Sequence, residues 1–275
     1  PSGYLALCSD NLSDPSIADP TAHFSATTWT GDGSSSRAIT TGVDADFVWY
    51  KDRTGTESNS LYDSIRGAQE RLISNSTAME ITRSNGLQSF DSTGFTVGSD
   101  DECNNSSKNY VGFTWKAGGT ASSNTDGTIT SSVSANTDAG MSVVSFTNPA
   151  SGSGTIGHGL GVKPEMIITK ARSGTGNWTA THKSLGSNMQ DYYLLLNDNA
   201  AVVTSSGIWG GEPTSSVFSS SASLQVPSAT MIAYCFHGVD GYSKVGSYTG
   251  NGVSDGAFVY TGFRPAFFMV KNAST

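Results

Sequence analysis

Short runs of β-branched and aromatic residues, each ended by Gly, Asn, Asp or Ser, recur along most of the chain. Residues 47–51 and 166–170 are almost continuously apolar up to a closing lysine, as expected for central strands buried on both faces. Residues 95–98 alternate between apolar and polar, which indicates a half-buried strand, and residues 192–196 end at an Asn-Asp-Asn turn. The pattern therefore predicts an antiparallel β protein with many turns.

One segment alone has helical spacing. Residues 61–73 place apolar side chains three or four positions apart, and Arg66 with Glu70 forms an i,i+4 pair on the other face. We therefore expect one short helix in the first half of the chain. Its apolar face would consist of Leu61, Ile65, Ala68 and Leu72.

The apolar run and its surroundings occur three times. Asp46 opens the sequence DFVWYKDR, Glu165 opens EMIITKAR, and Ala266 opens AFFMVKN. Each run follows a related lead-in, which reads GVDA, GVKP or GFRP. The ends of the first two copies also correspond, with YVGFTWK at 110–116 and MIAYCFH at 231–237. A period of about 100 residues indicates tandem units. The lysines that close the runs are interpreted as strand-boundary residues, with a shared functional role as the alternative; they are Lys51, Lys170 and Lys271.

These correspondences predict an all-β chain of tandem antiparallel β-sandwich units of jelly-roll or lectin-like type, with the short helix in the first. Residues 1–20 are interpreted as a lead-in, and complete units are expected at 21–120 and 141–244. A truncated third unit would begin at 245 and run to 275. Residues 121–140 are nearly all Ser, Thr, Gly, Asn and Asp, so they form either a linker or an edge ribbon.

Composition supports a β fold and excludes several partners. The 44 Ser, 30 Thr and 32 Gly are poor helix formers, while 12 Phe, 10 Tyr and 5 Trp can fill a core. A net charge of −8 without a basic cluster does not favour nucleic acid, and no apolar run is long enough for membrane insertion. Cys8, Cys103 and Cys235 are too few and too scattered for a disulfide framework or a zinc site.

No set of residues predicts catalysis. Residues 152–157 match G-x-G-x-x-G, but more glycines and a proline follow where a nucleotide site needs a helix. No two histidines have metal-ligand spacing, and no G-x-S-x-G sequence occurs. The chain is therefore expected not to be an enzyme and to need no cofactor.

One acidic loop offers oxygen ligands for Ca²⁺. Asp100, Asp101 and Glu102 are consecutive, and Asn104 and Asn105 follow them. Carboxylate and amide oxygens are the ligands that Ca²⁺ prefers. The spacing of an EF-hand is absent, so a solvated loop is the alternative.

Carbohydrate binding needs exposed aromatic rings beside polar groups, because sugars stack on a ring and bond through their hydroxyls. The candidates for such a site are Trp209, Trp178, Tyr192 and Tyr193. Trp209 is the first choice, because it lies in the glycine-rich loop SGIWGG where a large ring is hard to bury. The alternative is that these tryptophans belong to the core.

Several phrases of the first unit carry a family resemblance: GVDADFVWYKDR at 42–53, LYDSIRGA at 61–68, SFDSTGFTVGSD at 89–100 and YVGFTWKAGG at 110–119. They resemble a repeated domain of structural proteins of tailed phages, often marine or cyanobacterial. The second unit has further phrases of this family at 157–164, 182–186, 213–218 and 241–252. Asp44 and Ala45 depart from its usual aromatic-any-Pro lead-in. Residues 5–20 resemble the segment that follows an N-terminal lectin-like domain in such proteins.

The resemblance implies a virion structural protein, most often a tail fibre or tail spike, and it brings no catalytic residues. We expect a spacer and adhesion module at the particle surface. Its partners would be itself in a homotrimer, other virion proteins and a host cell-surface glycan. A capsid decoration or head-fibre protein is the alternative. A polysaccharide depolymerase and a bacterial surface adhesin are less favoured, because no acidic pair recurs between the units and no anchor is visible.

Overall fold

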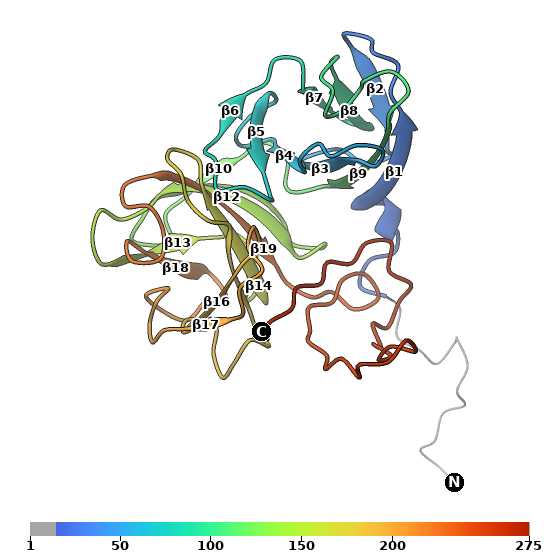
Figure 1. Ribbon diagram of the computed structural model, residues 1–275. Coiled ribbons are helices and arrows are strands. Elements are labelled where there is room, and N and C mark those ends of the chain that lie inside the picture. Colours follow the sequence, from blue (N-terminus) through green and yellow to red (C-terminus); the bar gives the residue numbers. More distant parts are fainter. Residues whose placement is uncertain (1–14, 275) are drawn as a thin grey trace.

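The computed structural model describes residues 15–274 of the chain. Within them the strands form several antiparallel sheets, and the one helical element is a single 3-10 turn, η2 (Pro20–Ala22). The predicted all-β class is confirmed. Figure 1 shows two β units stacked on one another, unit 1 in blue to green and unit 2 in green to orange. Most of the predicted lead-in, at residues 1–14, lies outside the described residues.

Unit 1 comprises β1 to β9 and has two sheets. Six strands lie in the order β1-β9-β3-β4-β5-β6, and three lie in the order β2-β8-β7. The strands are β1 (Phe24–Thr30), β2 (Arg37–Thr40), β3 (Phe47–Asp52), β4 (Ser60–Asp63), β5 (Glu70–Ile73), β6 (Ile81–Thr82), β7 (Leu87–Asp91), β8 (Gly94–Val97) and β9 (Asn109–Trp115).

Unit 2 comprises β10 to β19 and has an eight-stranded sheet, β10-β11-β12-β19-β14-β15-β16-β17, and a two-stranded sheet, β13-β18. The strands are β10 (Ser122–Asn124), β11 (Ser131–Asn136), β12 (Met141–Thr147), β13 (Ser153–Gly157), β14 (Met166–Ala171), β15 (Thr179–His182), β16 (Tyr192–Leu195), β17 (Val203–Thr204), β18 (Val217–Ser221) and β19 (Thr230–Phe236).

The two units share one strand order. The sheet β1-β9-β3-β4-β5-β6 recurs as β12-β19-β14-β15-β16-β17, and the pair β2-β8 recurs as β13-β18. The sequence copies at 46–53 and 165–172 therefore occupy equivalent strands. Unit 2 adds β10 and β11 at one edge, which is where the Ser- and Thr-rich segment 121–140 lies.

Each unit has an inner core between its two sheets. In unit 1, Val48 and Tyr50 of the larger sheet face Ile39 and Phe95 of the smaller one. Unit 2 has an equivalent core, which includes Ile167, Phe218 and Trp209. Alternate residues of a strand point to opposite faces, so half of each central strand remains for a second contact.

That second contact is a core shared by the units, which we call the shared core. Its members from unit 1 include Phe47, Leu61 and Leu72, and those from unit 2 include Val143, Ile168, Trp178, Ile232 and Tyr234. The ring of Phe47 stacks on that of Tyr234 with 4.4 Å between centroids. Because β3 is covered on both faces and paired on both edges, its sequence can be apolar at nearly every position.

The expected helix over residues 61–73 is wrong, because these residues form a hairpin. Leu61 in β4 pairs with Leu72 in β5, and both are fully buried in the shared core. The intervening turn has positive φ angles at Gly67 (101°) and Gln69 (74°), which a helix does not allow. The spacing misleads because a hairpin with a short turn also brings such apolar residues together on one face, as it does Leu61 and Leu72.

The C-terminal segment, residues 245–274, contains no strand and is drawn as red loops in Figure 1. The expected opening strands of a third unit are therefore not formed there. Several of its large apolar side chains are exposed to solvent, among them Phe258 at 89% and Phe268 at 81%. Across residues 15–274, no helix has the length and apolarity needed to cross a membrane.

Candidate functional site

The structure does not gather the four aromatic residues expected at a sugar site on one exposed surface. Trp209 is 2% exposed, and its Nε1 donates to the carbonyl oxygen of Tyr192 at 3.0 Å. Trp178 is 1% exposed, and its Nε1 donates to the carbonyl oxygen of Ile73 at 2.7 Å. Neither ring presents a face to solvent. The glycine-rich loop around Trp209 folds over the ring and buries it in the inner core of unit 2.

Tyr192 and Tyr193 are neighbours on β16, so their side chains point to opposite faces. The ring of Tyr192 packs against the backbone of Gly186, where even one added methyl group would lie 2.1 Å from the ring. Tyr193 packs against the inner core of unit 2 and lines a surface pocket. Of the four candidates, Tyr193 is the one that this pocket exposes to a ligand.

The pocket has a volume of about 300 Å³ and lies between β15, β16 and the loop after β18. No charged side chain lines it. Polar groups surround one aromatic ring and a few aliphatic side chains, and among the lining residues are Asn177, Thr179, Tyr193, Leu195, Ser223 and Gln225. Gln225 is 6% exposed, and its Nε2 donates to Thr169 Oγ1 at 2.7 Å, which fixes that wall. Such a surface suits a small neutral ligand that carries hydroxyl groups.

The acidic loop is not arranged as a calcium site. Asp100 forms an ion pair with Arg83 at 2.7 Å, and Glu102 forms one with Arg71. Asp101 accepts a hydrogen bond from Asn105 Nδ2 at 2.6 Å. Among residues 15–274, no three His, Cys, Asp or Glu side chains come together as metal ligands would. The carboxylates of Asp100 and Glu102 are neutralised by arginines and stabilise the loop instead.

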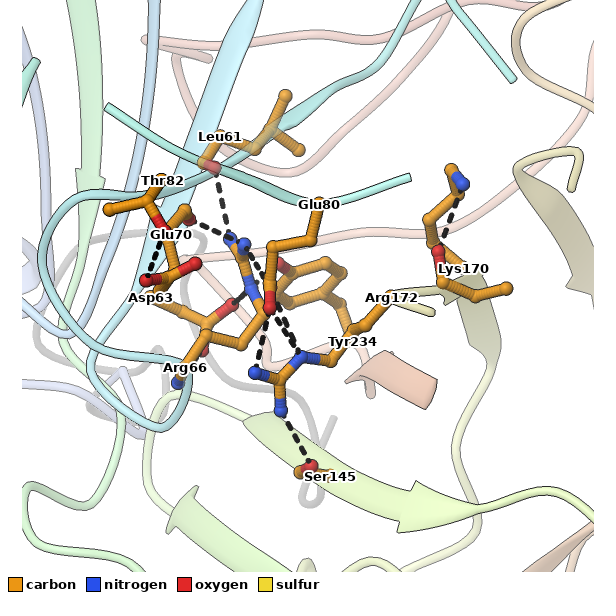
Figure 2. A network of polar contacts seen from close by, with 11 residues as sticks. Leu61, Asp63, Arg66, Glu70, Glu80, Thr82, Ser145, Lys170, Arg172 and Tyr234 are labelled. Atoms are coloured by element: carbon orange, nitrogen blue, oxygen red, sulfur yellow. Dashed lines mark hydrogen bonds and ion pairs between the residues drawn. The ribbon is translucent and has the colours of Figure 1, made fainter. Parts of the chain in front are cut away.

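A buried polar network connects the two units beside the shared core (Figure 2). Arg66 of unit 1 contacts Asp63 through Nε, and its Nη1 donates to Glu80 Oε2 at 3.0 Å. Glu80 in turn binds Arg172 of unit 2, with 2.8 Å between Oε1 and Nη2. Tyr234 of unit 2 donates its hydroxyl to Asp63 Oδ2 at 2.7 Å. Two carboxylates and two guanidinium groups therefore balance in charge across the interface.

Burial alters the acidity of this region. Desolvation raises the pKa of the Tyr234 hydroxyl, so it stays protonated and donates to Asp63. Lys170 has no exposed surface, and burial lowers its pKa to about 8. Its Nζ donates to the carbonyl oxygens of Ala171 at 2.9 Å and Thr77 at 3.4 Å. Since Thr77 belongs to unit 1, this lysine also connects the two units.

The three equivalent lysines share one kind of contact. Lys51 donates to the carbonyl oxygen of Glu57, Lys170 to those named above, and Lys271 to that of Ala200 at 3.2 Å. Each of these lysines closes an apolar run, and its ammonium group binds backbone carbonyl oxygens. Lys51 and Lys170 lie one residue before the ends of β3 and β14, as expected for strand-boundary residues, whereas Lys271 lies in a segment without a strand.

Sequence reasoning missed most of these residues. The sequence predicts Arg66 on the helix face opposite the apolar one, paired with Glu70, whereas its side chain is fully buried. The sequence contains only a weak signal for their burial. Because just 14% of the residues are charged, an Asp, Glu or Arg next to an apolar run is a candidate for a buried ion pair. No signal connected Asn177 with Gln225, because 48 positions separate them and only the fold brings them together.

Comparison with known proteins adds one finding. A protein-family model for a domain of unknown function, DUF7483, matches residues 19–275. The matched residues include both units and the C-terminal segment. No curated protein and no solved structure matches the chain.

Proposed function

This chain belongs to the DUF7483 family of domains of unknown function, and we propose that it is a rigid tandem module of a tailed-phage tail fibre. The shared core is the observation that carries this proposal. Burying a Leu or Phe side chain contributes about 1.5–3 kcal/mol, so separating units that bury Phe47, Leu61 and Leu72 between them is costly. Two fused units of lectin-like sandwich type would transmit force without bending at a linker.

The repeats support this function in a second way. A stack of similar units spaces a tip away from a particle, and a Ser- and Thr-rich chain with only 14% charged residues suits close packing of several chains. Under this proposal the module forms a homotrimer at the particle surface and contacts other virion proteins there. Light scattering of the recombinant chain tests the oligomeric state, and a trimer is the expected result.

Immunogold labelling of particles tests the location. Antibodies raised against the recombinant chain should decorate the tail fibres of the virus that encodes it, with pre-immune serum as the control. Labelling of the capsid would instead support a decoration or head-fibre protein. Labelling of the bacterial envelope alone would overturn the proposal in favour of a surface adhesin.

We assign host-glycan adhesion to the Tyr193 pocket. The ring of Tyr193 offers a stacking face, and Asn177 and Ser223 offer hydrogen bonds at a neutral rim. A glycosidase needs two carboxylates about 5–10 Å apart, and none of the residues that line this pocket is acidic. Binding without cleavage therefore suits this pocket better than depolymerase activity.

Titration with neutral monosaccharides and disaccharides, followed by NMR chemical shifts, tests the pocket. Binding should be weak, near the millimolar range, because a multivalent fibre gains avidity from several copies. Asn177→Ala should remove the shift changes, because it deletes a hydrogen-bonding group of the pocket. Asn177 is exposed at the rim, so the variant should keep the core intact. Tyr248→Ala, at an exposed tyrosine outside the pocket, is the matched control. Equal binding by both variants would refute the assignment.

A further inference from the structure

The C-terminal segment repeats the turns of the two complete units. Each unit has a pair of glycines with positive φ, nine residues apart, before its central strand, and a pair ten residues apart precedes residues 266–271; in unit 2, Gly159 lies between the two as a further glycine of this kind. Glycine is favoured wherever the backbone needs a positive φ. Positive-φ glycines at equivalent positions therefore indicate that the backbone follows the same local course in each copy. The pairs are Gly33 (73°) and Gly42 (80°), Gly152 (65°) and Gly161 (72°), and Gly252 (70°) and Gly262 (89°).

The strand that should follow these turns lacks partners. β3 lies between β9 and β4, and β14 lies between β19 and β15. Residues 266–271 carry the third copy of the same sequence, yet they pair with no strand in the described part of the chain. Phe258, Tyr260 and Phe268 are 89%, 71% and 81% exposed. Exposed apolar side chains gathered in one segment indicate an interaction site.

Phe267 of the third copy packs against a neighbouring unit, as the equivalent residues of the first two copies do. Phe267 occupies the position in the run that Phe47 and Met166 hold in the other copies. Phe47 belongs to the shared core, and Met166 packs against it.

Phe267 lies against the outer face of β1, β3 and β9, which we call the aromatic face. Its ring centroid is 4.7 Å from that of Phe113 and 5.4 Å from that of Trp115. The other members of the aromatic face are Phe24 and Trp49, with centroids 6.1 Å and 6.5 Å from that of Phe267. All three copies therefore direct their first apolar residue to a neighbouring unit.

We propose that the aromatic face is the docking surface of a third unit of the same fold, anchored by Phe267. Residues 245–271 supply the opening strands of that unit. In a complete unit, residues 266–271 would lie between a strand equivalent to β4 and one equivalent to β9, as β3 does in unit 1. The edges of 266–271 and the apolar side chains around them become buried when these strands pair.

The anchor is testable in the chain as it stands. Phe267→Ala should release the segment from the aromatic face, so limited proteolysis within residues 245–274 should accelerate by about tenfold or more. The emission of Trp49 and Trp115 should shift to the red as the ring above them is lost. Phe268→Ala is the matched control, since Phe268 is 81% exposed and should change neither signal. Equal behaviour of the two variants would overturn the anchor.

Completion of the unit is testable with the chain's own sequence. Residues 52–120, which follow Lys51 in unit 1, are appended after the equivalent Lys271, and a scrambled version of the same 69 residues is the control. Exchange at 266–271 should slow by about a hundredfold or more with the ordered extension alone. Equal exchange with both extensions would refute the proposal. Protection that instead grows with protein concentration in the unextended chain would also refute it, because a second copy would then be the partner.

Discussion

Arg66 is the residue whose removal should weaken the joined units most sharply. Its guanidinium group contacts the Asp63 carboxylate and Glu80, and it also donates to the carbonyl oxygens of Leu61 and Glu70 at 2.9 and 2.6 Å. The side chains of Arg66 and Asp63 have no exposed surface. Methionine at position 66 would keep the length and apolar contacts of the side chain but would leave a buried carboxylate without its counter-charge.

The size of the effect follows from that burial. Breaking a buried ion pair by removing one partner typically costs about 3–5 kcal/mol, whereas an exposed pair contributes about 0–1 kcal/mol. We therefore expect Arg66→Met to lower the free energy of unfolding by about 3–5 kcal/mol. Arg53→Met, at an exposed arginine of the same unit, should change it by less than about 0.5 kcal/mol.

Guanidinium chloride unfolding at pH 7, followed by tryptophan fluorescence, measures these differences. The decisive comparison adds Asp63→Asn in both backgrounds. In the wild type it removes a partner from Arg66 and should destabilise the chain. In the Arg66→Met background it removes an unpaired buried charge while keeping an acceptor for Tyr234, so it should restore at least about 1 kcal/mol. Destabilisation by Asp63→Asn in both backgrounds would show that the network is not held by charge.

Three further predictions concern buried titratable groups. Because burial lowers the pKa of Lys170 from 10.5 to about 8, its folded form binds fewer protons than the unfolded chain between these values. Stability from this group therefore rises from pH 8 to 10.5, by up to about 3 kcal/mol, and the difference between the wild type and Lys170→Met in urea unfolding should show it. His158 Nδ1 accepts from the backbone of Leu160, so its Nε2 carries the proton toward Thr214, and burial lowers its pKa below 6.5. Stability should then fall as the pH drops below 6.5, and ¹⁵N spectra at pH 6.5 should show His158 mainly as the neutral tautomer with its proton on Nε2. Burial raises the pKa of the Cys103 and Cys235 thiols to about 12, so mass spectrometry after treatment with a disulfide reagent should find both unmodified in the native state and modified after unfolding.

The sequence predicted the parts of the fold that depend on local patterns. The apolar runs that became β3 and β14 were recognisable because a strand covered on both faces needs apolar residues on both. The repeat located equivalent strands, since the same sequence in the same context folds in the same way. The hairpin from Ser60 to Ile73 was mistaken for a helix, because helical spacing and a tight reversal bring the same side chains together.

The candidate site was harder to predict, because it depends on contacts between distant residues. Trp209 was favoured for its glycine-rich loop, yet those glycines let the loop fold over the ring. Gly210 has a φ of 95°, and a Cβ there would lie 2.3 Å from Ser153, so the backbone approaches closely. Tyr193 has no local feature that separates it from Tyr192, and only the direction of β16 decides which ring reaches the pocket.

The buried polar network explains why the two sheets pack in a single arrangement, which the apolar contacts of the shared core do not explain by themselves. Two apolar sheet faces can pack in several ways, because alternating side chains offer similar surfaces after a shift of two residues. A carboxylate such as Asp63 has no such freedom, since it is stable in the interface only when Arg66 and Tyr234 both reach it. Glu80 imposes the same condition from the other side, because it must meet Arg66 and Arg172 together. We infer that the network contributes less to the strength of the joint than to its uniqueness. Replacing Asp63, Arg66, Glu80 and Arg172 together by apolar residues of similar size should therefore leave stability nearly unchanged while allowing more than one docking of the units, visible as doubled NMR resonances in β4 and β14.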